Sequence, residues 1–333
     1  MGSYGLANKL TFYPSFPLYS YARGMLKVSS NNIIDDETMK SLITLEPSKW
    51  HNIYKEGVQS LFYTDYLRKA TNFYMVLGHN FEYTQQFLAP PVVTVGVVND
   101  CGISVPSYNG WSLSTLDLSN NHDQKEFVLI GDIEEGIRIG SILYGKSWSA
   151  PRNVNLGQSY SVEYNSKQQK TVSGKTLSTL NYDKVSNWGN LPAWELMTND
   201  ENPAPESSGF TDYSDAFRYQ RTGVRSWSVN FSMLNDSDIL NQNQMVTSNG
   251  WTQDAASDYS TGADNSSLYN NQNSNDFMTS VYKLTMCSHL PVVVNISDSK
   301  NADQWAIVRI TKFSMKESNP KLIDISMVLE EQV

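Results

Sequence analysis

The chain has 333 residues and a mass of 37.5 kDa, a length typical of about two domains. Its formal net charge is −9, and Lys and Arg form no cluster of the kind that neutralises a phosphate backbone, so we expect no nucleic-acid partner. Aromatic residues make up 12% and charged residues only 18%, a composition that argues against intrinsic disorder.

Several other classes are disfavoured at this level. The two cysteines, Cys101 and Cys287, lie far apart and are expected to be buried thiols without a disulfide. The N-terminus has no basic flank before an apolar core, so no secretory signal is expected. The longest apolar run, residues 87–98, is shorter than the ~20 residues of a membrane span. We therefore expect no membrane insertion.

Taken in chain order, the apolar pattern is mostly that of short strands. Strands are predicted at residues 11–16, 92–98, 126–131, 137–145, 159–164, 225–234, 291–297, 304–315 and 322–330. Trp227, Val229 and Phe231 alternate with polar residues, as in a strand with one buried face, and residues 320–330 alternate in the same way. This spacing predicts a mainly β fold of sandwiches or barrels and not of βαβ units.

Helices are few. Residues 274–288 place Phe277, Val281 and Leu284 on one face, with Ser274 as the expected N-cap and Pro291 beyond the end. A second helix is predicted over residues 35–43. Long loops are expected at residues 186–216 and 249–273.

Aromatic side chains in these polar loops suggest an interface between subunits, since Trp and Tyr are enriched in interface cores. The candidate interface residues are Trp188, Trp194, Phe210, Trp251, Tyr259 and Tyr269. Trp111 is the candidate contact for a glycan, while Trp148 and Trp227 lie in strand patterns and are expected in the core.

No motif of known catalytic or metal chemistry is present, so we expect no enzyme activity, no cofactor and no metal site. His79 is best interpreted as closing a strand together with Gly78 and Asn80. The carboxylates Asp132, Glu134 and Glu135 fit a solvated turn better than a glycosidase pair. The Asp254, Asp258 and Asp264 group likewise fits a solvated loop better than a Ca²⁺ site.

Three segments resemble known families. Residues 71–98 (TNFYMVLGHNFEYTQQFLAPPVVTVGVV) and residues 137–179 resemble segments of phage tail proteins, the first through a strand that ends in Gly-His-Asn. Residues 32–50 (NIIDDETMKSLITLEPSKW) are similar to the start of galactose-binding-like jelly rolls. The C-terminal order of strand, helix, paired strands and terminal strand is similar to ring-forming distal-tail or baseplate proteins.

A domain boundary is expected near Ala150–Pro151, where a predicted strand ends and a proline begins the next segment. The resemblance implies an N-terminal arm (1–19) and two β-sandwich domains, a galactose-binding-like jelly roll (20–150) and a tail-ring-type assembly domain with one helix (151–333). It implies a structural component of a phage tail tip or baseplate, located in the virion tail after assembly in the host cytoplasm. Its partners would be copies of itself in a ring and other tail and baseplate proteins. The terminal strand 322–330 would then be an edge strand covered by a neighbouring copy.

Two alternatives are open. The N-terminal jelly roll would act as a carbohydrate-binding module that recognises a host surface glycan, although no sugar-binding residues of that family can be matched here. A hydrolase would use Asp132, Glu134 and Glu135 as its acids.

Overall fold

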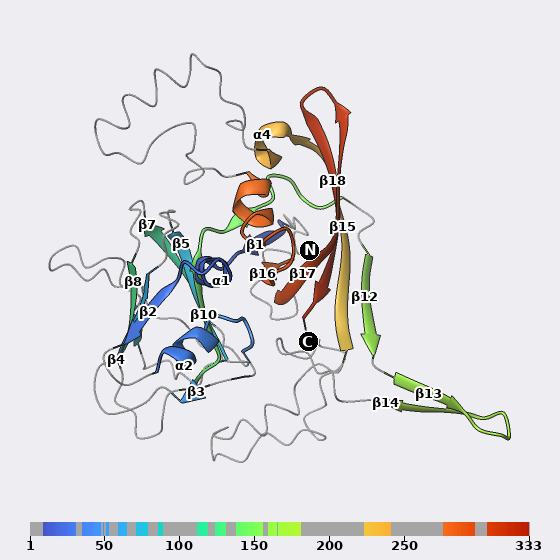
Figure 1. The fold of residues 1–333 in the computed structure, drawn as a ribbon. Coiled ribbons are helices and arrows are strands. Elements are labelled where there is room, and N and C mark those ends of the chain that lie inside the picture. The colour runs from blue at the N-terminus through green and yellow to red at the C-terminus, as the bar shows by residue number, and fades with distance from the viewer. Residues whose placement is uncertain are drawn as a thin grey trace, which may run out of the picture.

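The computed structural model describes residues 9–30, 35–47, 49, 51–52, 59–64, 71–78, 86–88, 112–118, 124–130, 138–155, 159–164, 166–180, 223–240, 276–296 and 305–332. Over these ranges the fold is mainly β, which confirms the predicted fold class (Figure 1). None of the helices in them is both long enough and apolar enough to span a bilayer.

The N-terminal half contains short elements. They are β1 (Thr11–Tyr13), α1 (Phe16–Ala22), β2 (Lys27–Ser30), α2 (Asp36–Ser41), β3 (His51–Asn52), β4 (Gln59–Thr64), β5 (Thr71–Leu77), β6 (Gln86–Leu88), β7 (Ser112–Leu118), β8 (Gln124–Ile130), β9 (Arg138–Ile139), β10 (Ser141–Gly145) and β11 (Trp148–Ser149).

The C-terminal half contains the long strands. Its elements are β12 (Ser159–Tyr164), β13 (Ser166–Lys170), β14 (Thr176–Leu180), β15 (Gly223–Asn235), α4 (Asp236–Ile239), the π-helix η2 (Met278–Tyr282), β16 (Val292–Asn295), β17 (Trp305–Asn319) and β18 (Leu322–Glu331).

A seven-stranded antiparallel sheet organises the molecule, in the order β11-β1-β16-β17-β18-β15-β12. Strands β1 and β11 come from the N-terminal half, so residues on both sides of position 150 share this sheet. The division at that position stays a prediction. The terminal strand β18 lies inside the sheet, between β17 and β15, so its predicted position at an edge is wrong.

The large sheet buries one face over most of its width. That face carries Trp227, Val229 and Phe231 of β15 and Ile325 and Met327 of β18, as their alternation predicts. The segment around η2 covers it: the Phe277 ring lies 5.7 Å from Phe12, 5.1 Å from Trp148 and 5.4 Å from Phe313, centroid to centroid. Trp148 and Trp227 are buried, as predicted.

The opposite face of the large sheet is covered only in part. A three-stranded sheet, β10-β5-β7, packs Phe73, Met75 and Leu77 of β5 against Trp305 and Ile307 of β17. On its other side, β5 presents Tyr74 and Val76 to a cluster that includes residues of α1 and α2. The β5 strand is therefore buried on both faces, which explains its unbroken apolar run from Phe73 to Leu77.

Two glycines permit close packing beside β5. Gly78 ends the strand with a φ of +66°, and Gly140 precedes β10. A Cβ atom at either position would collide with the carbonyl oxygen of Pro47. The strand does end at Gly78, as the sequence indicates, while His79 and Asn80 lie outside the described residues.

Two sequence predictions about local structure need correction. Residues 11–16 are predicted as one strand, but β1 ends at Tyr13 and α1 begins at Phe16, capped by the Ser15 hydroxyl, which accepts from the Leu18 N–H. Residues 276–288 form the π-helix η2 followed by turns, and just before η2 the Asp276 carboxylate accepts from the Thr279 N–H at 2.8 Å. Ser274 lies outside the described residues.

Cys287 is exposed, so the prediction of a buried thiol is wrong. The helical segment ends in three residues with positive φ, Met286, Cys287 and Ser288, and this left-handed turn carries the thiol away from the apolar core. Cys101 lies outside the described residues. The predicted helix at 35–43 is confirmed as α2.

Smaller sheets complete the fold. Strands β2, β4, β8 and β6 form one in that order, and β3 pairs with β9. Strands β13 and β14 form a two-stranded hairpin that projects from the end of β12, away from the rest of the described structure (Figure 1).

Candidate assembly interface

Strand β12 is the last strand of the large sheet among the strands that the structure describes. Along one side it pairs with β15, from Ser159 opposite Ser228 to Tyr164 opposite Gly223. Among the described strands, none pairs with its other side. Ser159, Tyr160, Ser161 and Glu163 are exposed, and a strand that pairs on one side can accept a further strand on the other.

The face of the sheet beside this edge is polar. Ser161, Ser226, Glu330 and Arg309 lie in register across β12, β15, β18 and β17, and Asn230, Ser326 and Ser314 form a parallel row. Arg309, Ser326, Ser314 and Glu330 are exposed. The face is thus apolar where the three-stranded sheet covers it and rich in hydroxyl groups where it does not.

A buried ion pair lies beside the C-terminal end of β12. The side chains of Arg225 and Glu331 are both buried. The Arg225 guanidinium donates to the Glu331 carboxylate through Nε at 2.9 Å and through Nη2 at 2.6 Å. Nη2 also donates to the Trp305 carbonyl at 2.7 Å, and the Arg225 Cζ lies 4.9 Å from the Trp227 ring centroid. Because Arg225 lies opposite Val162 of β12, this group joins β15, β17 and β18 where β12 leads into the hairpin.

The hairpin has an ordered tip. The Thr171 N–H donates to the Lys175 carbonyl at 2.8 Å and the Gly174 N–H to the Thr171 carbonyl at 2.9 Å. Gly174 has a φ of +80°, which suits glycine at this turn position. The Thr171 hydroxyl also accepts from the Lys175 N–H at 3.1 Å. These bonds hold Val172 fully exposed at the end of the hairpin.

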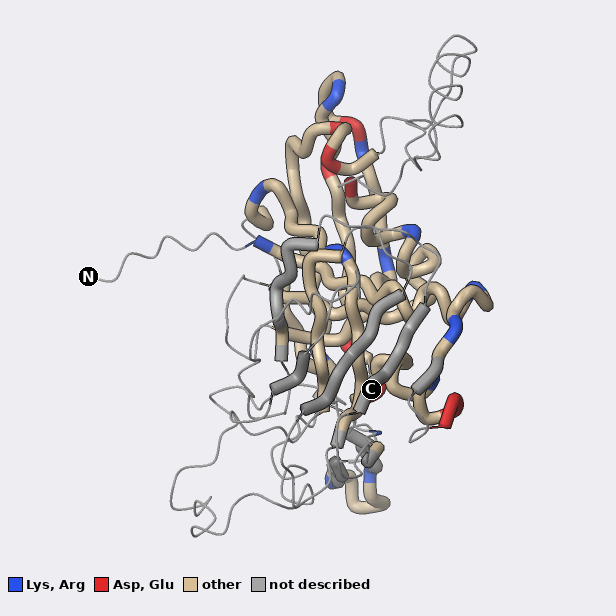
Figure 2. The backbone as a smooth tube through the Cα atoms, turned by 90° about the vertical axis from the view of Figure 1, so that its left-hand side faces the viewer, with Lys and Arg blue, Asp and Glu red and all other residues tan. Residues whose placement is uncertain are grey.

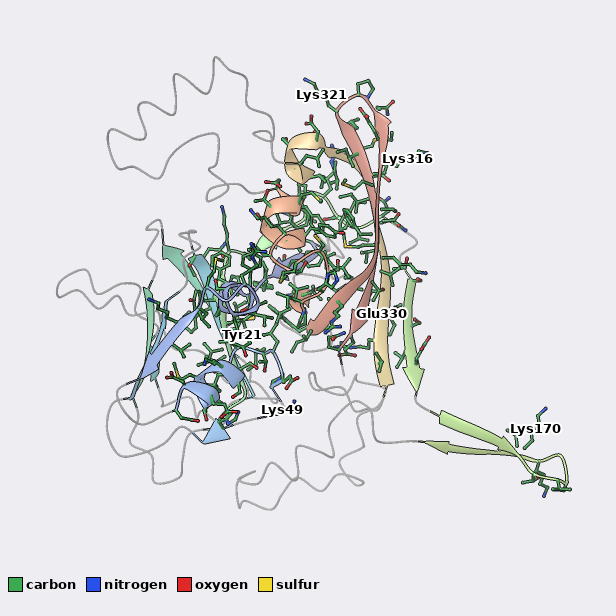
Figure 3. All side chains as sticks on the ribbon, in the orientation of Figure 1. Tyr21, Lys49, Lys170, Lys316, Lys321 and Glu330 are labelled. Atoms are coloured by element: carbon green, nitrogen blue, oxygen red, sulfur yellow. The ribbon has the colours of Figure 1, made fainter. Side chains whose placement is uncertain are left out.

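The hairpin is basic within an acidic protein. Residues 165–181 include Lys167, Lys170 and Lys175 and no Asp or Glu, whereas the whole chain has a net charge of −9. Figure 3 shows Lys170 on the hairpin, far from the main body of side chains.

The opposite end of the large sheet is acidic. We call residues 233–240 and 315–324 the acidic end; they carry the carboxylates of Asp236, Asp238, Glu317 and Asp324 and the ammonium groups of Lys316 and Lys321. Figure 2 shows the cluster of Asp and Glu at the top of the molecule, and Figure 3 labels Lys321 there, away from Lys170.

Two methionines are exposed at the acidic end. Met233 sits in the bulge of β15 with a φ of +56°, and its N–H donates to Asp324 Oδ1 at 2.8 Å. Met315 lies opposite Ile325 of β18. Both side chains are 41–50% exposed, so this end offers apolar as well as acidic groups.

A serine–histidine contact occurs elsewhere, between α2 and β3. Ser41 Oγ lies 2.6 Å from His51 Nε2. A hydrogen bond from the Thr38 side chain lowers the pKa of the nearby Asp35 carboxyl, and the electrostatic effect of His51 makes a smaller contribution in the same direction. The Ser41 hydroxyl, however, donates its proton to the Thr38 carbonyl at 2.7 Å. His51 Nε2 must therefore be the donor to Ser41, which is the reverse of a general-base arrangement.

The predicted site residues fall in segments that the structure does not describe. These are the interface candidates Trp188, Trp194, Phe210, Trp251, Tyr259 and Tyr269, the glycan candidate Trp111 and the carboxylates Asp132, Glu134, Glu135, Asp254, Asp258 and Asp264. The predictions about them stay open. In the ranges given above, no group of three or more His, Cys, Asp or Glu side chains is placed to hold a metal ion.

Sequence reasoning missed the hairpin and the buried ion pair. The hairpin had a signal, Ser-Gly between the segments SKQQK and TLSTL, together with lysines unmatched by acids. The ion pair had none, because Arg225 and Glu331 are separated by 106 residues and each reads as an ordinary polar position.

Neither a protein-family model, nor a curated protein, nor a solved structure matches the chain.

Proposed function

We propose that this protein is a structural component of a phage tail tip or baseplate, without catalytic activity, that assembles into a ring with copies of itself. The observation that carries the proposal is that β12 pairs on one side only among the described strands and continues into the projecting hairpin. A strand edge of this kind promotes association unless another chain covers it.

The two ends of the large sheet differ, and such a difference is compatible with a closed ring of head-to-tail contacts. Strand β12 leads into a basic hairpin, whereas β15 leads into the acidic α4. Contacts between unlike surfaces repeat head to tail and close into a ring when the rotation allows it. The resemblance of residues 71–98 and 137–179 to phage tail proteins supports the tail tip as the setting.

Native mass spectrometry across a range of protein concentrations tests the proposal. We expect a discrete closed oligomer whose stoichiometry does not change above its dissociation constant. A strict monomer at every concentration, or an open series of sizes without a preferred one, would contradict a self-assembling ring.

A pair of serine variants tests the role of the edge. Ser161→Lys places an ammonium group on β12, which pairs with β15 alone among the described strands, whereas Ser326→Lys places it on the same face but on β18, which is paired on both sides. Edge lysines disfavour strand pairing, so we expect Ser161→Lys to weaken the oligomer and Ser326→Lys to leave it intact. Equal effects would remove the edge from the interface.

The open polar face favours one alternative, recognition of a host glycan. Its Ser and Asn side chains offer donors and acceptors suited to sugar hydroxyls. A glycan-binding screen followed by Asn230→Ala and Trp111→Ala would locate such a site. A hit lost in Asn230→Ala but retained in Trp111→Ala would assign it to the sheet, and the converse result would assign it to Trp111.

A further inference from the structure

We propose that the hairpin tip of one copy, residues 170–175, docks on the acidic end of the large sheet of a second copy. This inference rests on the proposed function and names its contact: Val172 lies against Met233 and Met315, and Lys170 and Lys175 lie against the surrounding carboxylates.

The hairpin is suited to an intermolecular role. A two-stranded hairpin alone is at best marginally stable in water, and within the described structure β13 and β14 pair only with each other. Its tip is nevertheless ordered by the bonds of Thr171 and Gly174. A preformed tip loses little conformational entropy on binding, which favours its use as a docking element.

The two surfaces are complementary. The tip has a fully exposed apolar residue, Val172, beside Lys170 and Lys175. The acidic end has two exposed methionines beside four carboxylates and two ammonium groups. Methionine adapts to an irregular partner, and opposite charge gives the contact its specificity.

The geometry requires a second copy. The hairpin leaves the sheet beside Gly223, at the start of β15, and the acidic end begins at the last residues of that strand. Thirteen residues of strand span about 40 Å. Figure 1 shows the hairpin pointing away from α4, so the tip cannot reach the acidic end of its own chain.

A photo-crosslinking experiment tests the contact directly. A photoreactive amino acid replaces Val172 in the full chain, and equal amounts of ¹⁴N- and ¹⁵N-labelled protein are mixed, irradiated and digested. We expect crosslinks between differently labelled copies that map to residues 233–240 or 315–324. Crosslinks that map elsewhere overturn the docking proposal, as does an intact oligomer without crosslinks.

Charge exchange provides a second test. Lys170→Glu with Lys175→Glu is expected to raise the dissociation constant of the oligomer at least about tenfold, and Asp236→Lys with Asp238→Lys to do the same. All four changes in one chain restore assembly. The control, Lys9→Glu with Lys40→Glu, changes the net charge equally at exposed sites outside the contact and leaves assembly unchanged.

The outcomes separate the two proposals. An oligomer that is insensitive to the hairpin charges overturns the docking contact but leaves the proposed ring. A monomer at every concentration that gives no crosslinks overturns both.

Discussion

Strand β5 and the β13–β14 hairpin are both antiparallel, but they differ in how much of each strand is paired and buried. Strand β5 pairs on both sides and is buried on both faces, with the continuous sequence TNFYMVL. The hairpin pairs only within itself among the described strands, and its tip is exposed. The stability of the monomer therefore resides around β5 and the large sheet, which leaves the hairpin free to change without loss of fold.

The largest effect on stability is expected from breaking the buried ion pair between Arg225 and Glu331 in the large sheet. Glu331→Ala leaves the Arg225 guanidinium buried without its carboxylate, and we expect a loss of about 3–5 kcal/mol in the free energy of unfolding. Urea denaturation measures it. The matched control, Glu330→Ala, removes the neighbouring exposed carboxylate and should change stability by about 0.5 kcal/mol or less. Similar values for both would show that the pair does not anchor the sheet.

A smaller loss is expected beside β5. Gly140→Ala directs a methyl group at the Pro47 carbonyl, and the backbone must shift to admit it. We expect a cost of about 1–3 kcal/mol, as for other overpacked sites. Gly24→Ala is the comparison variant, although the backbone conformation of Gly24 differs from that of Gly140. It adds a methyl group where no atom lies within 4 Å, so any loss of stability there comes from the φ of +68° alone. Calorimetry of both variants separates collision from backbone strain.

These sites show what sequence reasoning can and cannot reach. Alternation in β15 and β18 reveals their buried faces, because burial on one side leaves a period of two. Strand order leaves no such trace, which is why β18 reads as an edge when it lies between β17 and β15. Ser15 and Pro17 are typical of a helix N-terminus and do indicate the start of α1, but the aromatic residues around them favour a strand.

The contact of Ser41 with His51 should have a modest structural effect. His51→Ala removes one hydrogen bond that links β3 to the end of α2, and we expect a loss of about 0.5–1.5 kcal/mol. Ser41→Ala should have a similar cost, and the double variant should be less destabilising than the sum. Strict additivity, measured in a double-mutant cycle, would show that the two side chains do not interact in solution.

Lys146 should give stability a pH dependence at high pH. Burial lowers the pKa of its ammonium group, and the nearby Asp276 raises it in part. Between the lowered pKa of the folded state and the ordinary value of 10.5, the folded chain loses the proton while the unfolded chain keeps it, so stability rises with pH. Lys146→Met should remove that rise, measured as urea midpoints from pH 7 to pH 10. The same slope in both proteins would contradict the assignment.

The smallest effect on folding is expected at the hairpin tip. Val172→Asp changes a fully exposed side chain that packs against nothing in the monomer, so the free energy of unfolding should move by no more than about 0.5 kcal/mol. Assembly, in contrast, should be strongly weakened, because a carboxylate would replace the apolar side chain of the tip and face the acidic end of the next copy. Denaturation of dilute monomer and native mass spectrometry of concentrated protein measure the two effects on one variant. A large loss of stability in the dilute monomer would mean that the tip packs on its own chain, and the contrast with β5 would then fail.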